Sequence, residues 1–183
     1  MEPIFIKDLF TEKERSDILE TLAKKEHFML EENGRTLNNL NSLSNEIKKK
    51  LLDLVESKLN KNLKIVGEGF ATYKKEYGDP SLDPHIDSNE TSYILDYQFD
   101  SNVEWPIFVE GESFTLNNNE AVLFSGKNQI HWRPKRKFSD DEYVSMIFFH
   151  FIDLDDIDRS KAREYTEEEK ARIDKYSKIW NES

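Results

Sequence analysis

Three side chains in the middle of the sequence have the types and the spacing of a metal site. His85 and Asp87 are two residues apart. On an extended strand, side chains two residues apart point to the same side, so the imidazole and the carboxylate converge while Ile86 turns away. A third ligand has to come from a different strand, and His131, in the strand-like run 129–133, is the candidate.

Two histidines and one carboxylate on one face of a metal leave its other coordination positions open. This facial triad is the arrangement with which non-haem Fe(II) enzymes bind O2 and a co-substrate. Zinc also accepts two histidines and one carboxylate beside an open position, so the ligand set alone leaves the metal undecided. Without the third ligand, a His-x-Asp pair is also an ordinary polar pair of a surface loop.

Strand-like segments surround these three residues. From about Leu63 onward, short runs rich in β-branched and aromatic residues are separated by Gly, Asn, Asp and Pro turn signals. The runs are 64–77, 91–99, 105–109, 113–116, 121–124, 129–133 and 143–152. Short strands with little helix between them predict a sandwich, jelly roll or barrel. The last run is apolar on both faces, so we expect it inside a sheet with cover on each side.

Helical patterns precede the strand-like region. Thr11 and Glu14 have the spacing of a capping box, which predicts the start of a first helix. A second helix is predicted over about 44–59, and residues 31–41 between the two helices read as a loop because they are rich in Asn and Gly. The expected apolar stripe of the first helix is Ile18, Leu19, Leu22 and Ala23.

The strongly charged tail predicts one more helix. Thr166 and Glu169 repeat the capping-box spacing, and apolar residues follow at helical intervals. The side chains expected to dock this helix are Ile173, Tyr176 and Trp180. We therefore expect a single domain over residues 1–183, with helical support in 1–62, a β core in 63–153 and a C-terminal helix in 154–183.

Composition and charge exclude several classes of protein. The chain has no cysteine, which excludes disulfides, cysteine nucleophiles and Cys-based metal sites. A net charge of −11 argues against nucleic-acid binding, because phosphate neutralisation requires a basic surface. The N-terminus does not resemble a signal peptide, and no apolar run reaches the roughly 18 residues of a membrane span. We expect a cytoplasmic protein without a membrane or nucleic-acid partner.

A family resemblance follows from these motifs. The segments YGDPSLDPHID, WPIFVEGE, EAVLFSG and HWR occur in this order between about Tyr73 and Asp153. This stretch resembles the core of 2-oxoglutarate/Fe(II)-dependent dioxygenases, in particular prolyl-hydroxylase-like proteins. The resemblance implies a mainly β fold with flanking helices around a double-stranded β-helix (jelly-roll or cupin-like) core. It also implies Fe(II) bound by His85, Asp87 and His131, with 2-oxoglutarate as co-substrate and O2. The carboxylate of Asp87 favours hydroxylation over halogenation.

One part of the family pattern is missing. Family members usually place an Arg or Lys at the start of the last core strand, where it pairs with the distal carboxylate of 2-oxoglutarate. The corresponding region 139–145 contains no basic residue. Arg133 is the first substitute, because it lies two residues after His131 and shares its face of a strand. Arg136 and Lys135 are alternatives that reach from a loop.

Other residues are candidates for contacts to ligands. Tyr73 and Tyr77 are expected to donate hydroxyls to the co-substrate or to be packing residues. Asp96 and Gln98 share one strand face and contact substrate if that face is interior, or are solvated if it is not. Trp105 lines a substrate pocket or belongs to the core.

Three functions fit these observations. The first is an Fe(II)/2-oxoglutarate-dependent oxygenase that hydroxylates an unactivated C–H bond of a small molecule or a protein side chain. The second is a cupin-like metal-binding protein that does not use 2-oxoglutarate, which the missing basic residue favours. The third is a non-catalytic β-barrel interaction module. In that case, replacement of His85 leaves the function intact. The sequence does not indicate the substrate or the oligomeric state.

Overall fold

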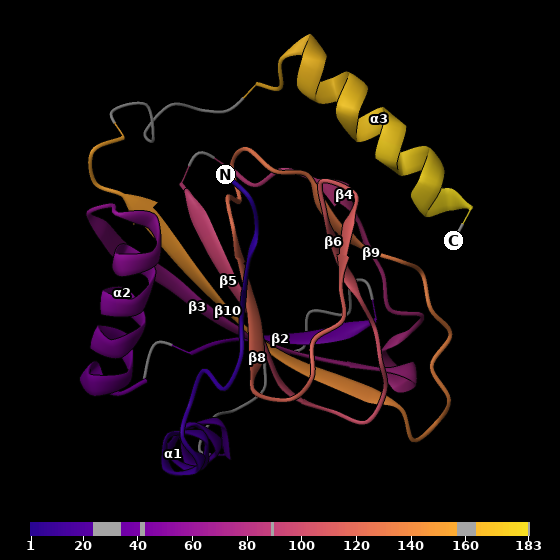
Figure 1. The fold of residues 1–183 in the computed structure, drawn as a ribbon. Coiled ribbons are helices and arrows are strands. Elements are labelled where there is room, and N and C mark those ends of the chain that lie inside the picture. Colours follow the sequence, from indigo (N-terminus) through magenta and orange to yellow (C-terminus); the bar gives the residue numbers. More distant parts are fainter. Residues whose placement is uncertain (24–33, 41–42, 89, 157–163, 183) are drawn as a thin grey trace.

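Two antiparallel sheets face each other (Figure 1), and a hydrophobic cluster lies between them. The computed structural model describes residues 1–23, 34–40, 43–88, 90–156 and 164–182. In order, the larger sheet contains β1 (Ile4–Ile6), β8 (Glu120–Phe124), β5 (Tyr93–Ser101), β10 (Tyr143–Asp153), β3 (Leu63–Lys74) and β2 (Arg35–Asn39). The smaller sheet contains β4 (Leu82–His85), β9 (His131–Arg133), β6 (Ile107–Val109) and β7 (Glu112–Phe114). This arrangement confirms the predicted mainly β, double-stranded β-helix core.

The strand β10 lies inside the larger sheet, between β5 and β3, as its apolar sequence predicted. Phe149 and Phe151 point to the outer face and pack in the cluster formed with the helices. Val144 and Met146 point the other way, into the cluster between the two sheets. Burial on both faces explains why this strand shows no alternation of polar and apolar residues.

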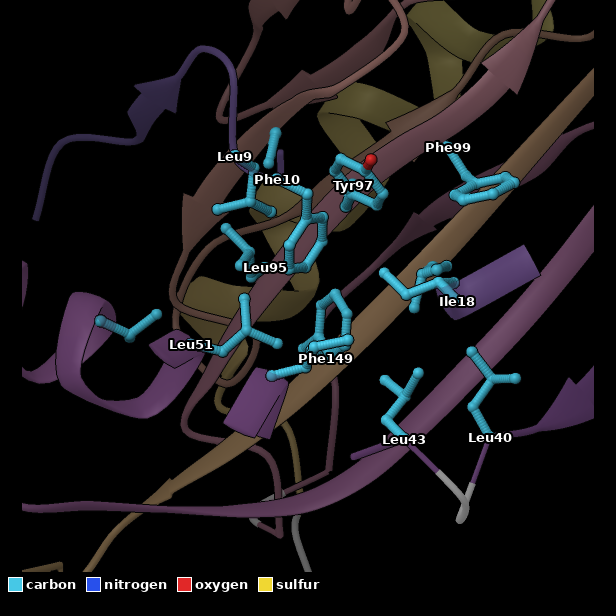
Figure 2. Close-up of a cluster of buried hydrophobic side chains, with 14 of the residues drawn as sticks. Leu9, Phe10, Ile18, Leu40, Leu43, Leu51, Leu95, Tyr97, Phe99 and Phe149 are labelled. Atoms are coloured by element: carbon cyan, nitrogen blue, oxygen red, sulfur yellow. The ribbon is translucent and has the colours of Figure 1, made fainter. Parts of the chain in front are cut away.

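Two helices, α1 (Glu12–Ala23) and α2 (Asn45–Leu59), cover the outer face of the larger sheet. The predicted capping box is present, since the Thr11 amide donates to the Glu14 carboxylate and the Glu14 amide donates to the Thr11 hydroxyl. Figure 2 shows Leu51 of α2 beside Phe149 of β10. The prediction was wrong for Leu19, which is 55% exposed, because the buried stripe of α1 is limited to Ile18 and Leu22.

Tyr97, in the middle of β5, makes the free energy of unfolding depend on pH. Its side chain is fully buried and its hydroxyl donates to Asn119 Oδ1 at 3.2 Å. Burial raises the pKa of Tyr97 to about 12. In the unfolded chain, a tyrosine loses this proton near pH 10. The buried Tyr97 hydroxyl therefore contributes fully to the free energy of unfolding below pH 10, and this contribution is lost as the pH rises towards 12.

We therefore expect the free energy of unfolding to fall by about 2–3 kcal/mol across this interval, at about 1.4 kcal/mol per pKa unit. Alkaline unfolding followed by circular dichroism should be shallower in Tyr97→Phe than in the parent protein. Tyr165→Phe, which changes an exposed tyrosine, is the matched control. Equal slopes in Tyr97→Phe and the parent would contradict the assignment.

The helix α3 (Glu167–Asn181) packs on the outer face of the smaller sheet (Figure 1). The predicted capping box of Thr166 and Glu169 is formed. Tyr176 lies against Trp132 of β9, with ring centroids 4.6 Å apart, and Trp132 stacks on Phe108 of β6. No helix in the described part of the chain combines the length and the apolar character needed to cross a membrane.

The strand β2 was not predicted, since residues 31–41 were interpreted as a loop. Arg35–Asn39 pairs in antiparallel register with β3, while residues 31–33 and 41 lie outside the described residues. A polar strand of this kind forms because β3 offers it a hydrogen-bonding edge, and tertiary pairing overrides a weak local preference. The correction matters for the site, because β2 brings Arg35 and Leu37 to its wall.

Candidate metal centre

His85, Asp87 and His131 come together between the two sheets. His85 at the end of β4 pairs in register with His131 of β9, and their ring centroids are 4.2 Å apart. Asp87 Oδ1 lies 3.7 Å from His85 Nε2 and 3.9 Å from His131 Nε2. All three candidate ligand atoms lie within 4.8 Å of one another. Bonds of about 2 Å to a common ion place neighbouring donors about 3 Å or more apart, so the three side chains surround a volume of suitable size.

Main-chain carbonyl groups fix the orientation of both imidazoles. His85 Nδ1 lies 2.7 Å from the Asp83 carbonyl, and His131 Nδ1 lies 3.1 Å from the Gln129 carbonyl. Because a carbonyl only accepts hydrogen bonds, the neutral form of each ring carries its proton on Nδ1 and its lone pair on Nε2. Both lone pairs therefore belong to the nitrogens next to Asp87, which is the tautomer that a metal requires.

His131 is kept neutral by its surroundings. It is 3% exposed, and burial together with the neighbouring His85 lowers its pKa well below the usual range. Neutral imidazole is the form that binds metals.

Gly126 determines where the carboxylate of Asp87 can lie. The Asp87 amide donates to the Gly126 carbonyl at 2.9 Å, so the two backbones are in direct contact. A Cβ atom at position 126 would lie 2.4 Å from Asp87 Oδ2 and 3.2 Å from Ile94. A side chain at position 126 would therefore force the Asp87 carboxylate to move.

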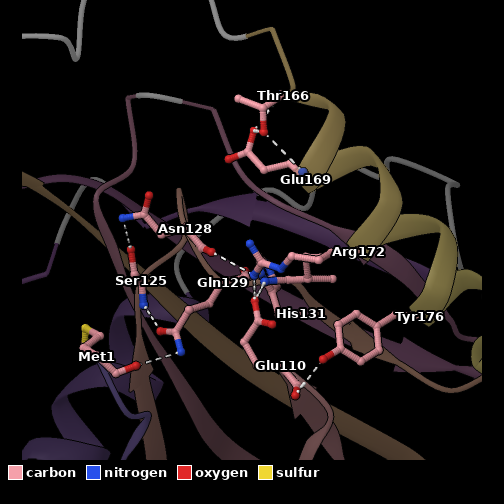
Figure 3. A network of polar contacts seen from close by, with 11 residues as sticks. Met1, Glu110, Ser125, Asn128, Gln129, His131, Thr166, Glu169, Arg172 and Tyr176 are labelled. Carbon is pink, nitrogen blue, oxygen red and sulfur yellow. Dashed lines mark hydrogen bonds and ion pairs between the residues drawn. The ribbon is translucent and has the colours of Figure 1, made fainter.

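The segment before His131 is fixed by side-chain hydrogen bonds of Gln129 (Figure 3). Its amide oxygen accepts from the Ser125 amide at 2.8 Å, and its amide nitrogen donates to the Met1 carbonyl at 3.1 Å. Gln129 therefore holds the loop from β8 to β9 and, through its own carbonyl, the ring of His131.

Glu110 connects the same segment to α3 (Figure 3). Its carboxylate accepts from the Ile130 amide at 2.7 Å and pairs with Arg172. Its carbonyl accepts from the Tyr176 hydroxyl at 2.9 Å. On the other side of the triad, the Tyr165 hydroxyl donates to the carbonyl of Ile86, whose side chain is buried away from the site as predicted.

A cavity of about 320 Å³ adjoins the triad. Its wall includes His85, Asp87 and His131, with apolar side chains from both sheets. Among the described residues, Arg35 is the only arginine or lysine that lines it. Asp96 is the inward-facing acidic residue of β5 in the same wall.

Arg133, Asp96 and Trp105 form one buried group. Arg133 is 1% exposed, donates to Asp96 Oδ2 at 3.0 Å and to the Trp105 carbonyl at 2.6 Å, and lies over the Trp105 ring at 4.9 Å. Burial raises the pKa of Asp96, although the charge of Arg133 acts in the opposite direction. Asp96 reaches the cavity, whereas Arg133 and Trp105 are not among the described residues that line it.

The other predicted contact residues lie elsewhere. Gln98 is buried and donates to Ser101 Oγ and the Leu116 carbonyl, so the solvated alternative was wrong for both Gln98 and Asp96. Tyr73 is buried and its hydroxyl accepts from Arg35 at 2.9 Å. Tyr77 ends the short 3-10 helix η1 (Lys75–Tyr77), outside the described cavity wall.

Two basic residues of the loop after β9 have partners away from the cavity. Arg136 pairs with Glu142 at 3.2 Å and with the Glu104 carbonyl, and Lys135 donates to Asn181 at 3.3 Å. Neither is among the described residues that line the cavity.

Sequence reasoning missed Arg35 as a residue of the site. A strand-like alternation was the available signal, with Arg35 and Leu37 on one face and Thr36 and Asn38 on the other. It did not predict a strand because it is short and mostly polar. His150 of β10 also lines the cavity, with Nδ1 3.4 Å from Thr91 Oγ1, and it is outside the group of three candidate ligands.

The fold is similar to that of several solved structures. HygX from Streptomyces hygroscopicus, solved with nickel, 2-oxoglutarate and hygromycin B, has a TM-score of 0.64 at 11% identity, with 84% of this chain and 83% of HygX covered. An oxidoreductase of the 2OG-Fe(II) oxygenase family from Burkholderia pseudomallei has a TM-score of 0.62 at 10% identity, covering 81% and 83%. The collagen prolyl hydroxylase of Paramecium bursaria Chlorella virus-1, solved with 2-oxoglutarate, has a TM-score of 0.60 at 9% identity, covering 82% and 95%.

The resemblance inferred from the sequence is thus confirmed at the level of the fold. No protein-family model matches the sequence, and no curated protein matches it significantly.

Proposed function

We propose that this chain is a non-haem Fe(II)- and 2-oxoglutarate-dependent oxygenase that hydroxylates a C–H bond of a small molecule or a peptide side chain. The observation that carries the proposal is the position of His85 and His131. Both protonated Nδ1 atoms point to main-chain carbonyls, and both Nε2 atoms lie beside Asp87 in the wall of a cavity. The fold supports the same chemistry.

The residues of this chain have three tasks in the proposed reaction. His85, Asp87 and His131 would hold the iron. The bound metal, with 2-oxoglutarate and O2, supplies the oxidation of the C–H bond. The carbonyls of Asp83 and Gln129 hold the imidazoles in their orientation, and apolar side chains from both sheets line the cavity beside them.

Arg35 is our candidate for binding the distal carboxylate of 2-oxoglutarate. It lines the cavity, and the buried Tyr73 hydroxyl accepts a hydrogen bond from its Nη1. The guanidinium of Arg133, the first candidate by sequence, already pairs with Asp96. Arg35 forms no ion pair with the described residues. A guanidinium in this position suits a carboxylate, because its N–H donors match the two oxygens.

Replacing Arg35 with glutamine is expected to weaken 2-oxoglutarate binding about 10- to 100-fold, the range for losing a charge-assisted hydrogen bond. Fe(II) affinity should stay unchanged, because Arg35 is not in the triad. Anaerobic titration of each ligand measures both constants. Arg136→Gln, which removes an arginine outside the described cavity wall, is the matched control. If Arg136→Gln weakens 2-oxoglutarate and Arg35→Gln does not, the assignment of Arg35 is wrong.

The proposed function is tested by adding Fe(II) and then 2-oxoglutarate to the metal-free protein under anaerobic conditions. A visible metal-to-ligand charge-transfer band is expected on addition of 2-oxoglutarate. Iron binding without this band would favour the cupin-like alternative, which the pairing of Arg133 with Asp96 also supports. Absence of metal binding would leave a non-catalytic interaction module.

A further inference from the structure

Asp96 has a carboxylate oxygen that no described group of the protein satisfies. Asp96 is 2% exposed and lines the metal cavity. Its Oδ2 accepts from Arg133, whereas its Oδ1 is buried and lacks a hydrogen-bond partner among the described residues. Its neighbours on the adjacent strands are Val122 and Phe148, whose side chains have no donor to offer.

A buried acceptor without a donor is unfavourable, because the oxygen has lost its hydrogen bonds to water. The Arg133 side of the carboxylate is occupied, and the flanking strands are apolar at this level. The cavity is therefore the direction from which a donor can arrive. A ligand with an O–H or N–H group at this point would complete the hydrogen bonding of Asp96.

We propose that Asp96 Oδ1 forms a substrate subsite in the metal cavity that recognises a neutral O–H or N–H donor, such as a hydroxyl or an amide. This inference deepens the proposed function and rests on it, since it assigns a substrate class to the same cavity. A neutral donor is favoured because Arg133 already balances the charge of Asp96. An ammonium would lose its hydration close to a guanidinium, and a carboxylate would face a second carboxylate.

The charges around the cavity separate the two organic ligands. Arg35 offers a cation to the dianionic co-substrate, whereas Asp96 Oδ1 only accepts hydrogen bonds, and a carboxylate has no donor to offer it. The subsite at Asp96 therefore remains available to the substrate. The polar group of the substrate donates a hydrogen bond to Asp96 Oδ1 and does not bind a cation. Discrimination of this kind is strong, because a ligand without the donor leaves a buried carboxylate oxygen unpaired.

The test compares cyclohexanol, cyclohexylammonium and cyclohexanone, which have the same ring and differ in the polar group. Dissociation constants are measured by protein NMR, first on the metal-free protein, so that no compound binds through an ion, and then on the zinc-loaded protein. In the parent protein, cyclohexanol should bind about tenfold more tightly than cyclohexanone, as expected for one hydrogen bond to a charged acceptor. Cyclohexylammonium should bind more weakly than cyclohexanol.

Asp96→Asn should invert this order. Its amide has to keep the oxygen towards Arg133 and then presents its NH2 group to the cavity, so the ketone becomes the preferred compound. Ile107→Val, which trims an apolar residue of the same wall, should leave the order unchanged. If Asp96→Asn folds and still prefers the alcohol, the donor is recognised elsewhere and the proposal is overturned.

Equal binding in the parent protein overturns the subsite even if Asp96→Asn does not fold. If cyclohexanol and cyclohexanone bind equally well, the ligand donates no hydrogen bond to Asp96 Oδ1, and the proposed subsite is wrong. Metal binding is measured separately by zinc titration. An alcohol preference without metal binding would support the subsite and overturn the proposed function, whereas metal binding without a preference would overturn the subsite alone.

Discussion

Replacing Gly126 with alanine is expected to weaken Fe(II) binding about 100-fold, the upper range for residues that orient metal ligands. The added Cβ would lie 2.4 Å from Asp87 Oδ2, a distance that requires movement. The Asp87 amide is held by the Gly126 carbonyl, so the carboxylate has to rotate while the backbone stays in place. Because both oxygens belong to one carboxylate, displacing Oδ2 also moves Oδ1 from its position beside the imidazoles. Metal affinity, measured by competition with a chelator, should fall while the fold persists.

The same cavity offers a matched control for this variant. Gly67 of β3 also lines the wall, but a Cβ there would meet His150 at 3.7 Å, an ordinary contact. Gly67→Ala should therefore bind Fe(II) like the parent protein. His131→Ala, which removes a proposed ligand, shows how far the Fe(II) affinity falls when the site is lost. If Gly126→Ala and Gly67→Ala bind iron equally well, the carboxylate of Asp87 is not held as we describe.

Replacing Arg133 with methionine is expected to lower the free energy of unfolding by about 3–5 kcal/mol, as for other buried ion pairs that lose one partner. Arg133 and Asp96 are 1% and 2% exposed, so the remaining carboxylate has no access to bulk water. Urea unfolding monitored by tryptophan fluorescence measures the change.

A double variant separates the destabilisation caused by an unpaired buried charge from the stabilisation contributed by the ion pair. Asp96→Leu combined with Arg133→Met should recover most of the lost stability, because no buried charge remains. The destabilisation of Arg133→Met alone should decrease at low pH. Burial raises the pKa of Asp96, so the folded state binds a proton that the unfolded state releases, and stability falls as the pH rises. Additive effects of the two substitutions would show that the ion pair is not the reason.

Local patterns in the sequence were sufficient for several parts of this structure. The capping boxes at Thr11 and Thr166 identified the starts of two helices, because the hydrogen bonds of a cap join residues three apart. The apolar run of β10 identified the central strand. The placement of His85 and Asp87 on one side and Ile86 on the other followed from the two-residue period of an extended chain.

Contacts between the two sheets could not be predicted from such patterns. Arg133 was expected on the same face as His131, and Asp96 was expected to be either interior or solvated, but their pairing depends on how β9 of the smaller sheet is placed against β5 of the larger sheet. Arg35 entered the site because β2 pairs with an edge of β3, and the short, mostly polar alternation of residues 35–39 is too weak to specify this pairing. For this reason the candidate metal ligands were found from sequence, whereas the charge pattern of the cavity required the structure.

The pairing of β4 with β9 has a consequence for how the protein folds. His85 and His131 are neighbours in space but 46 positions apart in the chain (131 minus 85), and α3 then packs over β4. Contacts of such long range form late, because loop closure has to precede them. The capacity to capture a metal should therefore emerge only in the slowest folding phase. The ion would enter a finished compartment, unlike the zinc of small fingers, around which the chain itself condenses.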